Sequence, residues 1–505
     1  MLNSENKILV IDISSNKIKV GLVSEDLKLG STINQNLTII NEDVDGFAKR
    51  FDMNDMWNKL KKSIYELLNE QYKSKRINII GISSCAQRMA VVFLDNKGDT
   101  IYGGPNIDVR GIDSAYLIED QFSEEELFQI TGHSPSILFC LARLLWFKEE
   151  QEHYYNKIGK VLMLDDWIIY KLTGEFCTDL SSAGESQMVD IEKENWSLDI
   201  IEAFDFNPDL FPEFIDSGMI AGDLLPELIS YFNFNQKSIP VIKSGGDTQA
   251  TLLGMGVIND GNIGISLGST APIHLVVNKP ILDPNCNFWT TFHSIKGKWL
   301  IEGNSGNTGI VYDWLKDYFL FTEGVDKNEL IENLIQEIKP GSDSTFAFLG
   351  PELMNIKDQT LLKRGVFVFP PPTLITEKLP KFGNFLRSGI ENIGFGINEN
   401  FIELKKYTQS EIRTFSAGGM SKSTEFCKIL TNILDQKLII PQFKDSAFLG
   451  CAMNTLIGLN KYPNYKKLID DLIEFEEFLV DKKISDEYKK VYNQWKNLKK
   501  HLSKL

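Results

Sequence analysis

A carboxylate follows two consecutive glycines at Gly245-Gly246-Asp247, directly after the strand-like segment 240–242. Two glycines permit a tight turn that presents a side chain from the end of a strand. A carboxylate in that position can accept the proton of an attacking hydroxyl group. Gly-Gly-Asp is also a frequent loop sequence, so the pattern alone makes Asp247 only a candidate general base. The small residues that follow it, in the predicted helix from 250 onward, favour a packed functional turn.

Two other turns have residue types suited to phosphate binding. Asp12 ends a strand-like segment and is followed by the polar residues 14–16, with Lys17 and Lys19 beyond them. An acid there can hold a metal ion through water, and the N–H groups of the turn can face a phosphate. Segment 266–270 combines glycine, which permits close backbone approach, with hydroxyl donors. A capped turn and an ordinary hairpin turn are the simpler interpretations.

A third glycine-containing turn, segment 416–423, lies between a predicted strand and a predicted helix. Gly418-Gly419 at the start of a helix can pass close to a flat base or a ribose. Ser423 also has the residue type of a helix N-cap. The nucleoside-binding and N-cap interpretations are compatible with each other.

Polar and charged residues beside two further strands are candidates for binding a polyhydroxylated ligand. They are Gln87-Arg88 and the segment 106–110, which contains Asp108 and Arg110. Carboxylates and guanidinium groups suit several hydroxyls because each can make two directed hydrogen bonds. A surface ion pair between Asp108 and Arg110 is the simpler interpretation of the second segment.

The composition excludes several classes of protein. The net charge of −16 argues against a nucleic-acid binder, which usually presents a basic face. No apolar run has the length of a membrane span, and the first residues lack the pattern of a signal peptide, so we expect a cytoplasmic protein. The six cysteines form no CxxC pair and the five histidines have no zinc-site spacing.

The elements that must position these residues occur twice in the chain. A strand, a turn and a second strand are predicted over 8–23, and the same order recurs over 264–277. From Asp12 to Ser266 the offset is 254 residues, about half of the 505 residues. We therefore expect two copies of one α/β domain, over 1–249 and 250–505, facing each other across a cleft. Coincidence is the alternative, because strand-turn-strand units are common.

In their order and spacing, these motifs resemble the FGGY family of carbohydrate kinases over nearly the whole chain. The matching segments are 12–19 for the first phosphate motif, 166–175 for the hallmark D-x-x-x-Y-x-L-T-G-E with 178–183 after it, 245–247 for the catalytic turn, 266–270 for the second phosphate motif, 417–419 for the adenosine motif and 446–452 for the A-A-L-G-A-A helix.

The resemblance implies an α/β fold of two actin-like (ribonuclease-H-like) ATPase domains, with the acceptor mainly on the N-terminal domain and ATP mainly on the C-terminal one. It implies Asp247 as the catalytic base, with Asp12 and Asp247 binding Mg²⁺. The implied acceptor contacts are Gln87, Arg88, Asp108, Asp247 and Thr248. The implied ATP contacts are Ser15, Asn16, Lys19, Gly268, Ser269, Gly418, Gly419 and Ser423.

Departures from the family pattern bear on the acceptor. Ser14-Ser15 replaces the usual Gly-Thr of the first phosphate motif, which makes phosphate contacts there less certain. Met89 replaces the glutamate of glycerol kinases, which lowers the expectation for glycerol. Segments 84–88 and 106–110 are similar to those of autoinducer-2 kinases, so an autoinducer-2-like or pentulose acceptor is favoured over glycerol or erythritol.

A small polyhydroxylated molecule and ATP are the expected partners, without nucleic acid or membrane, and a homodimer is left open. The alternative from another class is a non-catalytic, sugar-sensing member of the actin-like ATPase superfamily. The presence of Asp12, Asp247 and both phosphate turns argues against it, because a binding module need not keep the base.

Overall fold

The computed structural model describes residues 5–72, 77–319, 326–354, 364–371, 373, 379–443 and 445–502. The predicted hairpin at the start of the chain consists of β1 (Glu5–Ile13) and β2 (Lys17–Ser24). Ser14 closes its turn, because the Ser14 N–H donates to the carbonyl of Lys17 at 3.0 Å. The antiparallel register sets Asp12 opposite Lys19, which brings an acid and a base to the same end of the hairpin.

Four more strands complete the N-terminal sheet: β3 (Leu29–Asn36), β6 (Ile77–Ala86), β14 (Ile220–Asp223) and β15 (Pro240–Gly246). Their order is β14-β15-β6-β1-β2-β3. Strand β2 is antiparallel to β1 and β3, whereas β6 is parallel to β1 and β15. The carboxyl ends of β1, β6 and β15 therefore meet at one edge, where Asp12 and Asp247 are located.

Seven strands form the C-terminal sheet: β16 (Asn262–Leu267), β17 (Pro272–Val277), β18 (Trp289–Phe292), β19 (Trp299–Asn304), β22 (Arg413–Gly418), β23 (Leu438–Pro441) and β24 (Phe475–Phe478). Their order is β18-β19-β17-β16-β22-β23-β24. Within it, β19-β17-β16 pair antiparallel and β16-β22-β23 pair parallel, as β3-β2-β1 and β1-β6-β15 do in the first sheet. The repeated fold and the two actin-like domains are thus confirmed.

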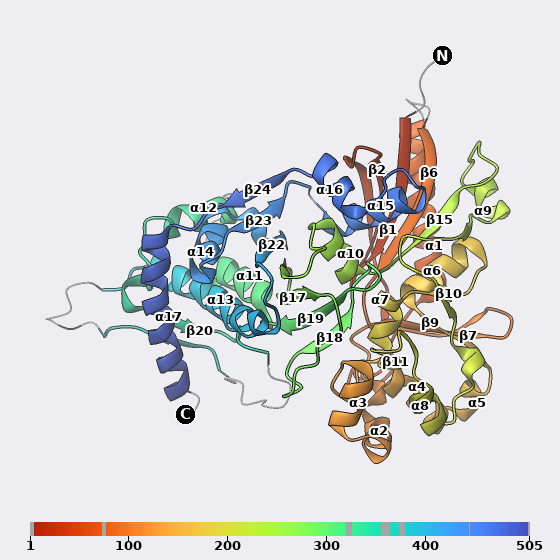
Figure 1. Ribbon diagram of the computed structural model, residues 1–505, viewed down its shortest axis with the longest axis horizontal. Coiled ribbons are helices and arrows are strands. Elements are labelled where there is room, and N and C mark those ends of the chain that lie inside the picture. Colours follow the sequence, from red (N-terminus) through yellow and green to blue (C-terminus); the bar gives the residue numbers. More distant parts are fainter. Residues whose placement is uncertain are drawn as a thin grey trace.

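Two helices pack against each other where the two halves of the chain meet (Figure 1). They are α10 (Asp247–Gly254) and α15 (Ser446–Gly458). Helix α15, from the C-terminal half, packs on the N-terminal sheet, where it shares a hydrophobic core with Ile8 and Val10 of β1. Helix α10 contacts both sheets, with Leu253 in that core and Leu252 in the core beneath the C-terminal sheet. The predicted domain boundary at 249/250 falls within α10.

Other helices cover the outer faces of the two sheets. On the first sheet, Leu9, Ile11 and Ile13 pack in a core with α1 (Met53–Tyr72), α6 (Leu164–Thr173) and α9 (Pro226–Tyr231). On the second, the core contains residues from α11 (Thr308–Phe319), α12 (Lys327–Ile335), α13 (Phe382–Leu404), α14 (Thr424–Leu434) and α17 (Lys482–Leu502).

The N-terminal half also carries a lobe built around the three-stranded sheet β8-β7-β9, which Figure 1 shows below the main sheet. Its elements are β7 (Val91–Asp95), β8 (Thr100–Gly104), α2 (Ala115–Gln121), α3 (Glu124–Thr131), α4 (Cys140–Glu150), α5 (Glu152–Tyr155), β9 (Ile158–Met163) and α8 (Leu198–Ala203). Shorter elements complete the fold: β4 (Ile39–Asn41), β5 (Lys49–Phe51), β10 (Cys177–Thr178), α7 (Leu180–Ala183), β11 (Val189–Asp190), β12 (Asn195–Trp196), β13 (Glu213–Phe214), β20 (Phe346–Phe348), β21 (Val366–Val368) and α16 (Tyr465–Leu472).

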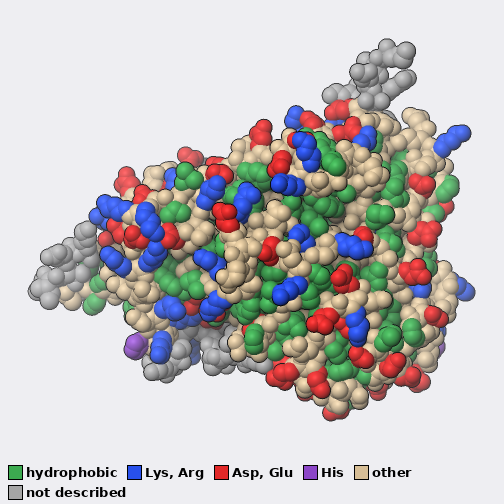
Figure 2. Space-filling model, in the orientation of Figure 1, with side chains coloured by type: hydrophobic (Ala, Val, Ile, Leu, Met, Phe, Trp, Pro, Cys, Tyr) green, Lys and Arg blue, Asp and Glu red, His purple; other side chains and the backbone are tan. Residues whose placement is uncertain are grey.

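Acidic and basic side chains are interspersed on the face shown in Figure 2, and acidic ones gather over the lower lobe. Among the described residues, no helix is both long and apolar enough to cross a membrane.

Candidate active site

A cavity of about 710 Å³ opens at the edge where the two sheets meet. Asp247 and Thr248 line it from the start of α10, and Lys19 lines it from β2. The C-terminal sheet contributes the turn after β16, with Gly268, and the turn after β22, with Gly418. Residues predicted from both halves of the sequence therefore face one space.

A second cavity, of about 640 Å³, lies next to the first, between α11, α12 and the start of α14. Gly268, Gly419 and Lys422 line both cavities, and Ser269 and Ser423 line the second. Ser423 is also the predicted N-cap, because its hydroxyl accepts the N–H of Phe426 at 3.2 Å. The second cavity also has the carboxylates of Asp313, Glu329 and Glu332 on its walls, which the sequence analysis did not single out.

Different structural constraints apply to the glycines of these turns. Gly418 has φ +125°, and a Cβ atom there would lie 2.4 Å from the carbonyl oxygen of Leu267, so the two turns touch directly. By contrast, a Cβ on Gly419 would meet nothing within 4 Å, and one on Gly268 only the Thr270 carbonyl at 3.7 Å. The protein itself leaves space at Gly268 and Gly419, as close approach of a ligand requires.

Asp247 is the first residue of α10 and directly follows β15. Gly245 has φ +78°, and a Cβ there would lie 2.0 Å from the hydroxyl of Ser181, so this turn requires glycine. Burial raises the pKa of Asp247 to about 6, against the opposing charge of Arg88. The Thr248 hydroxyl donates to Asp247 Oδ1 at 3.3 Å. The carboxylate is thus poised to exchange a proton near neutral pH.

Asp12 lies at the end of β1, on the same edge. Burial and the neighbouring carboxylates of Asp247 and Asp445 raise the pKa of Asp12 to about 8. A cation beside Asp12 would offset the negative charge of its two neighbours, and carboxylate oxygens are the hard ligands that Mg²⁺ prefers. Asp12 and Asp247 thus have the residue type that binds Mg²⁺, although among the described residues they do not form, with Asp445, a group whose oxygen atoms all lie within 4.8 Å of one another. Asp445 was not among the predicted site residues, although an Asp directly before a helix is a typical N-cap and could have been noticed as such.

Lys19 forms an ion pair with Asp445 and lies over the ring of Phe448 at 4.9 Å. The structure thus brings Lys19 to the cavity but holds its charge with a carboxylate. Ser15 and Asn16 are exposed on the turn between β1 and β2, where the Ser15 hydroxyl accepts from the Asn106 side chain at 3.4 Å. Within the described part of the chain, Ser15 and Asn16 lie outside the lining of both cavities.

Gln87 and Asp108, which were predicted to contact the acceptor, form hydrogen bonds to neighbouring parts of the chain. Gln87 is buried, and its amide bridges two loops: Nε2 donates to the carbonyl of Ser14 at 3.1 Å, and Oε1 accepts from the Asn106 N–H at 3.2 Å. Asp108 is fully buried and accepts from Tyr102, from the Lys49 N–H at 2.8 Å and from Arg110 Nε at 2.7 Å. The Asp108–Arg110 pair exists, but it is buried rather than on the surface. Spacing alone could not reveal these partners, because most lie far away in the sequence.

Arg88 lies beside Asp247 and makes ion pairs across the two halves of the chain. Its Nη1 and Nη2 atoms donate to both oxygens of Glu302, at 2.6 Å and 3.0 Å. Nη1 also lies 3.2 Å from Glu185. Neither glutamate was among the predicted site residues. Glu302 could have been noticed because it lies inside the apolar strand β19, and a buried charge requires a charged or hydrogen-bonding partner.

The hallmark segment 166–175 lies on α6, behind the catalytic turn. Lys243 of β15 is fully buried there and pairs with Asp165 and Asp166, with Asp179 at 3.5 Å. These three carboxylates are close enough together to hold a metal ion, but the Lys243 ammonium group already occupies the centre of the cluster. We therefore interpret the cluster as a support for the turn that carries Asp247.

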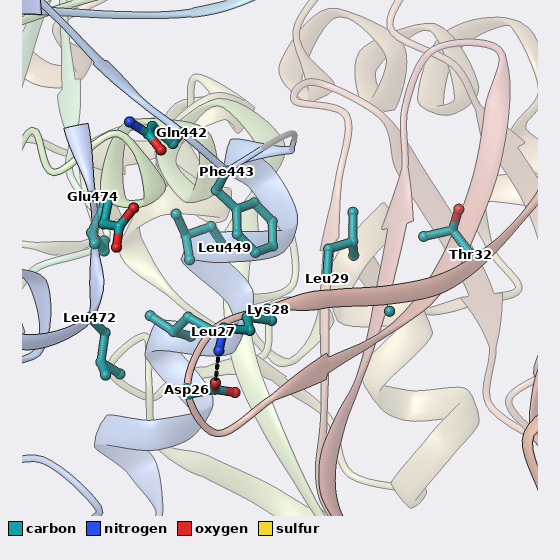
Figure 3. Close-up of a pocket in the computed structure, with 12 residues that line it drawn as sticks. Asp26, Leu27, Lys28, Leu29, Thr32, Gln442, Phe443, Leu449, Leu472 and Glu474 are labelled. Atoms are coloured by element: carbon teal, nitrogen blue, oxygen red, sulfur yellow. Dashed lines mark ion pairs between the residues drawn. The ribbon is translucent and has the colours of Figure 1, made fainter. Parts of the chain in front are cut away.

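A further cavity, of about 560 Å³, lies beside the active-site cleft (Figure 3). Leu27, Leu29, Leu449 and Leu472 make much of its lining apolar. Gln442 and Phe443 line both this cavity and the cleft, so the segment 442–443 separates the two. The predicted site residues lie elsewhere.

Comparison with known proteins identifies the family. Residues 7–254 match the N-terminal domain of the FGGY family of carbohydrate kinases, and residues 264–459 match its C-terminal domain. The chain belongs to the FGGY family. It is therefore a carbohydrate kinase, as the motifs predicted, and membership disfavours the non-catalytic alternative.

Relatives and solved structures agree over the whole chain. The autoinducer-2 kinase of Salmonella choleraesuis is 24% identical over 98% of this chain and 96% of its own. The xylulose kinase of Lactobacillus acidophilus has a similar fold, with a TM-score of 0.87, 17% identity and coverage of 99% of this FGGY kinase and 98% of that chain. Plasmodium falciparum glycerol kinase with ADP gives a TM-score of 0.83 and 18% identity, with 98% of each chain covered. At these identities the structural likeness shows the fold alone.

Proposed function

We propose that this FGGY kinase transfers the γ-phosphoryl group of ATP to a hydroxyl of a small polyhydroxylated acceptor, with Asp247 as the general base. The observation that carries the proposal is the position of Asp247. It lies in the cavity shared by both halves of the chain, between the glycine turns of the C-terminal sheet and Arg88 of the N-terminal one. A base at this junction can reach an acceptor on one side and a triphosphate on the other.

ATP would lie across the two connected cavities. We assign the nucleoside to the 640 Å³ cavity, beside Gly419 and Ser423, and the phosphates to the turn at Gly268 and Ser269. Lys19 and Lys422 line the 710 Å³ cavity beside Gly268, and Lys19 would exchange Asp445 for a phosphate oxygen. Asp12 and Asp247 would hold Mg²⁺, which neutralises charge on the phosphates when bound.

Asp247 would accept the proton of the acceptor hydroxyl as that hydroxyl attacks the γ-phosphorus in line. A pKa of about 6 leaves the carboxylate mostly ionised at neutral pH while keeping enough proton affinity to act as a base. Little covalent work is required of the protein, so positioning and charge neutralisation dominate. Closure of the two halves would exclude water from the reacting groups.

An autoinducer-2-like or pentulose acceptor remains favoured. The support is the similarity to an autoinducer-2 kinase over 98% of the chain, together with segments 84–88 and 106–110. Glycerol or erythritol is the second candidate. Met89, which is buried and has φ +62°, offers no carboxylate to a polyol, and this argues against glycerol.

The test is ADP release measured with ATP and a panel of glycerol, erythritol, xylulose, ribulose and the autoinducer-2 precursor. We expect turnover that depends on one of these acceptors. The Asp247→Asn variant should lose about a thousandfold in kcat, because general bases typically contribute 10²–10⁴-fold. Affinity for ADP measured without Mg²⁺ should change by less than about tenfold, since Asp247 acts on the acceptor and the metal rather than on the nucleoside.

Asp283→Asn is a matched control, because it neutralises a buried carboxylate on a loop outside both nucleotide cavities. It should keep kcat near the wild-type value. An Asp247→Asn enzyme with wild-type kcat would refute the assignment of the base. Absence of acceptor-dependent ADP release across the panel would refute the proposed acceptor class.

A further inference from the structure

The guanidinium group of Arg88 has its charge satisfied by two carboxylates. Glu302 accepts from both terminal nitrogens, at 2.6 Å and 3.0 Å, and Glu185 lies 3.2 Å from Nη1. Both carboxylates are buried, with relative exposures of 2% and 0%. This arrangement leaves little of the Arg88 charge for a ligand.

Glu302 remains ionised in this environment. Although burial raises the pKa of Glu302, the charge of Arg88 and the contact with His274 hold it below its ordinary value. The fully buried His274 places Nε2 3.1 Å from Glu302. Around Asp247, one arginine thus faces the carboxylates of Glu185, Glu302 and Asp247 itself, so negative charge prevails.

Two acceptor oxygens in the cluster around Arg88 lack a donor. Within the described part of the chain, Glu185 Oε2 and Gln249 Oε1 are buried and have no hydrogen-bond partner. The Gln249 amide donates to the other Glu185 oxygen at 3.1 Å, so the two side chains form one unit. Unpaired acceptor oxygens are satisfied by a hydroxyl donor and repel a carboxylate, which can only accept.

We propose that Glu302 is a specificity-determining residue that makes the acceptor site select uncharged polyols and ketoses over sugar acids. The inference rests on the proposed function, since it takes Asp247 as the base beside which the acceptor binds. A free arginine beside the base would pair with the carboxylate of a sugar acid through two parallel hydrogen bonds. Glu302 takes both of those positions.

The experiment compares matched acceptors that differ in one carboxylate: xylitol with xylonate, glucitol with gluconate, and erythritol with erythronate, alongside xylulose and ribulose. Acceptor-dependent ADP release gives kcat/KM for each. The wild-type enzyme should use neutral acceptors and not the acids. In Glu302→Gln, the ratio of kcat/KM for acids over neutral acceptors should rise about tenfold or more, because one like charge has been removed.

Glu391→Gln is the matched control. Glu391 is equally buried on α13 and pairs with Arg387 at 3.1 Å, away from the cleft. Glu391→Gln should leave the ratio of kcat/KM for acids over neutral acceptors unchanged. If Glu302→Gln does not fold, Glu185→Gln tests the same charge from the other side of Arg88, and it should raise the ratio in the same direction.

The outcomes are distinguishable. If no acceptor stimulates ADP release, the proposed function fails. If the wild-type enzyme uses an acid as well as its neutral partner, the kinase assignment stands and the specificity role is overturned. If both glutamine variants keep the wild-type ratio while kcat or stability falls, Glu302 only ties the two halves together, and the proposal is again overturned.

Discussion

The close crossing of α10 and α15 depends on two glycines, Gly254 and Gly450. The variant Gly450→Ala tests whether this crossing supports stability and catalysis. A Cβ on Gly450 would lie 1.9 Å from the Ala250 carbonyl oxygen and 2.7 Å from its carbon. A Cβ on Gly254 would similarly lie 1.9 Å from the carbonyl oxygen of Ser446. These neighbours are backbone atoms, so no side-chain rotation can relieve the contact.

The size of the effect follows from this geometry. Real Cβ atoms essentially never approach a neighbour within 3.0 Å, so Gly450→Ala must move the helices apart by about 1 Å. Overpacking of this kind costs about 1–3 kcal/mol in the free energy of unfolding, even though alanine favours a helix. Asp247 begins α10, so the shift would also displace the proposed base. A 1 Å misplacement can cost about a hundredfold in rate.

The assay is urea unfolding together with acceptor-dependent ADP release. Gly394→Ala is the matched control, because Gly394 is also a buried helical glycine. Its added Cβ would lie within 3 Å of only the flexible end of Ile433, at 2.6 Å. We expect the control to keep both its stability, within about 1 kcal/mol, and its kcat. Wild-type stability and kcat in Gly450→Ala, or equal losses in both variants, would refute the reasoning.

Two further predictions concern buried charge. Lys243→Met leaves three buried carboxylates without their cation and should reduce the free energy of unfolding by about 3–5 kcal/mol. Lys296→Met, the control, breaks an exposed pair with Asp216 and should cost less than about 1 kcal/mol. Urea unfolding measures both costs, and equal costs would contradict a stabilising role of the buried ion-pair network. In the metal-free enzyme the pKa of Asp12 is raised to about 8, so its contribution to stability is complete below about pH 4 and is lost as the pH rises through about 8. Asp12→Asn should therefore be more stable than the metal-free wild type at pH 8 by about 1–3 kcal/mol, and Mg²⁺ should stabilise the variant less than the wild type. Thermal unfolding of both proteins with chelator at pH 5 and pH 8 measures the difference. The same pH dependence in both proteins would contradict the prediction.

The repeated fold could be predicted because its signal is local. Each copy begins with apolar strands joined by a polar or small-residue turn, and these features appear in short windows of sequence. What the sequence could not indicate is the exchange of helices between halves. Helix α15 is apolar on much of its surface, but nothing in its sequence says that it packs on the sheet of the other half.

The sequence indicated candidate site residues most directly at the glycine turns and at the Gly-Gly-Asp turn, where few other roles explain the residue types. Gly268 and Gly419 leave space for a ligand, as their turns suggested, and Asp247 lies where its turn directs it. The sequence could not indicate that Gln87 and Asp108 are buried and hydrogen-bonded within the protein, because a polar residue beside a strand can serve a ligand or the fold equally well. Their partners, such as Ser14 and Lys49, become neighbours only through folding.

The base strength of Asp247 results from opposing influences that neither half of the chain provides alone. Burial raises its pKa, and the positive charge of Arg88 lowers it. If Arg88 were unpaired, its full charge would act on Asp247 and would weaken the base. Glu302, from the C-terminal sheet, and Glu185, from the N-terminal half, share that charge, and Glu185 itself raises the pKa of Asp247. The same ion pairs that we propose to exclude acidic acceptors therefore also keep the carboxylate basic enough to take a proton from a hydroxyl.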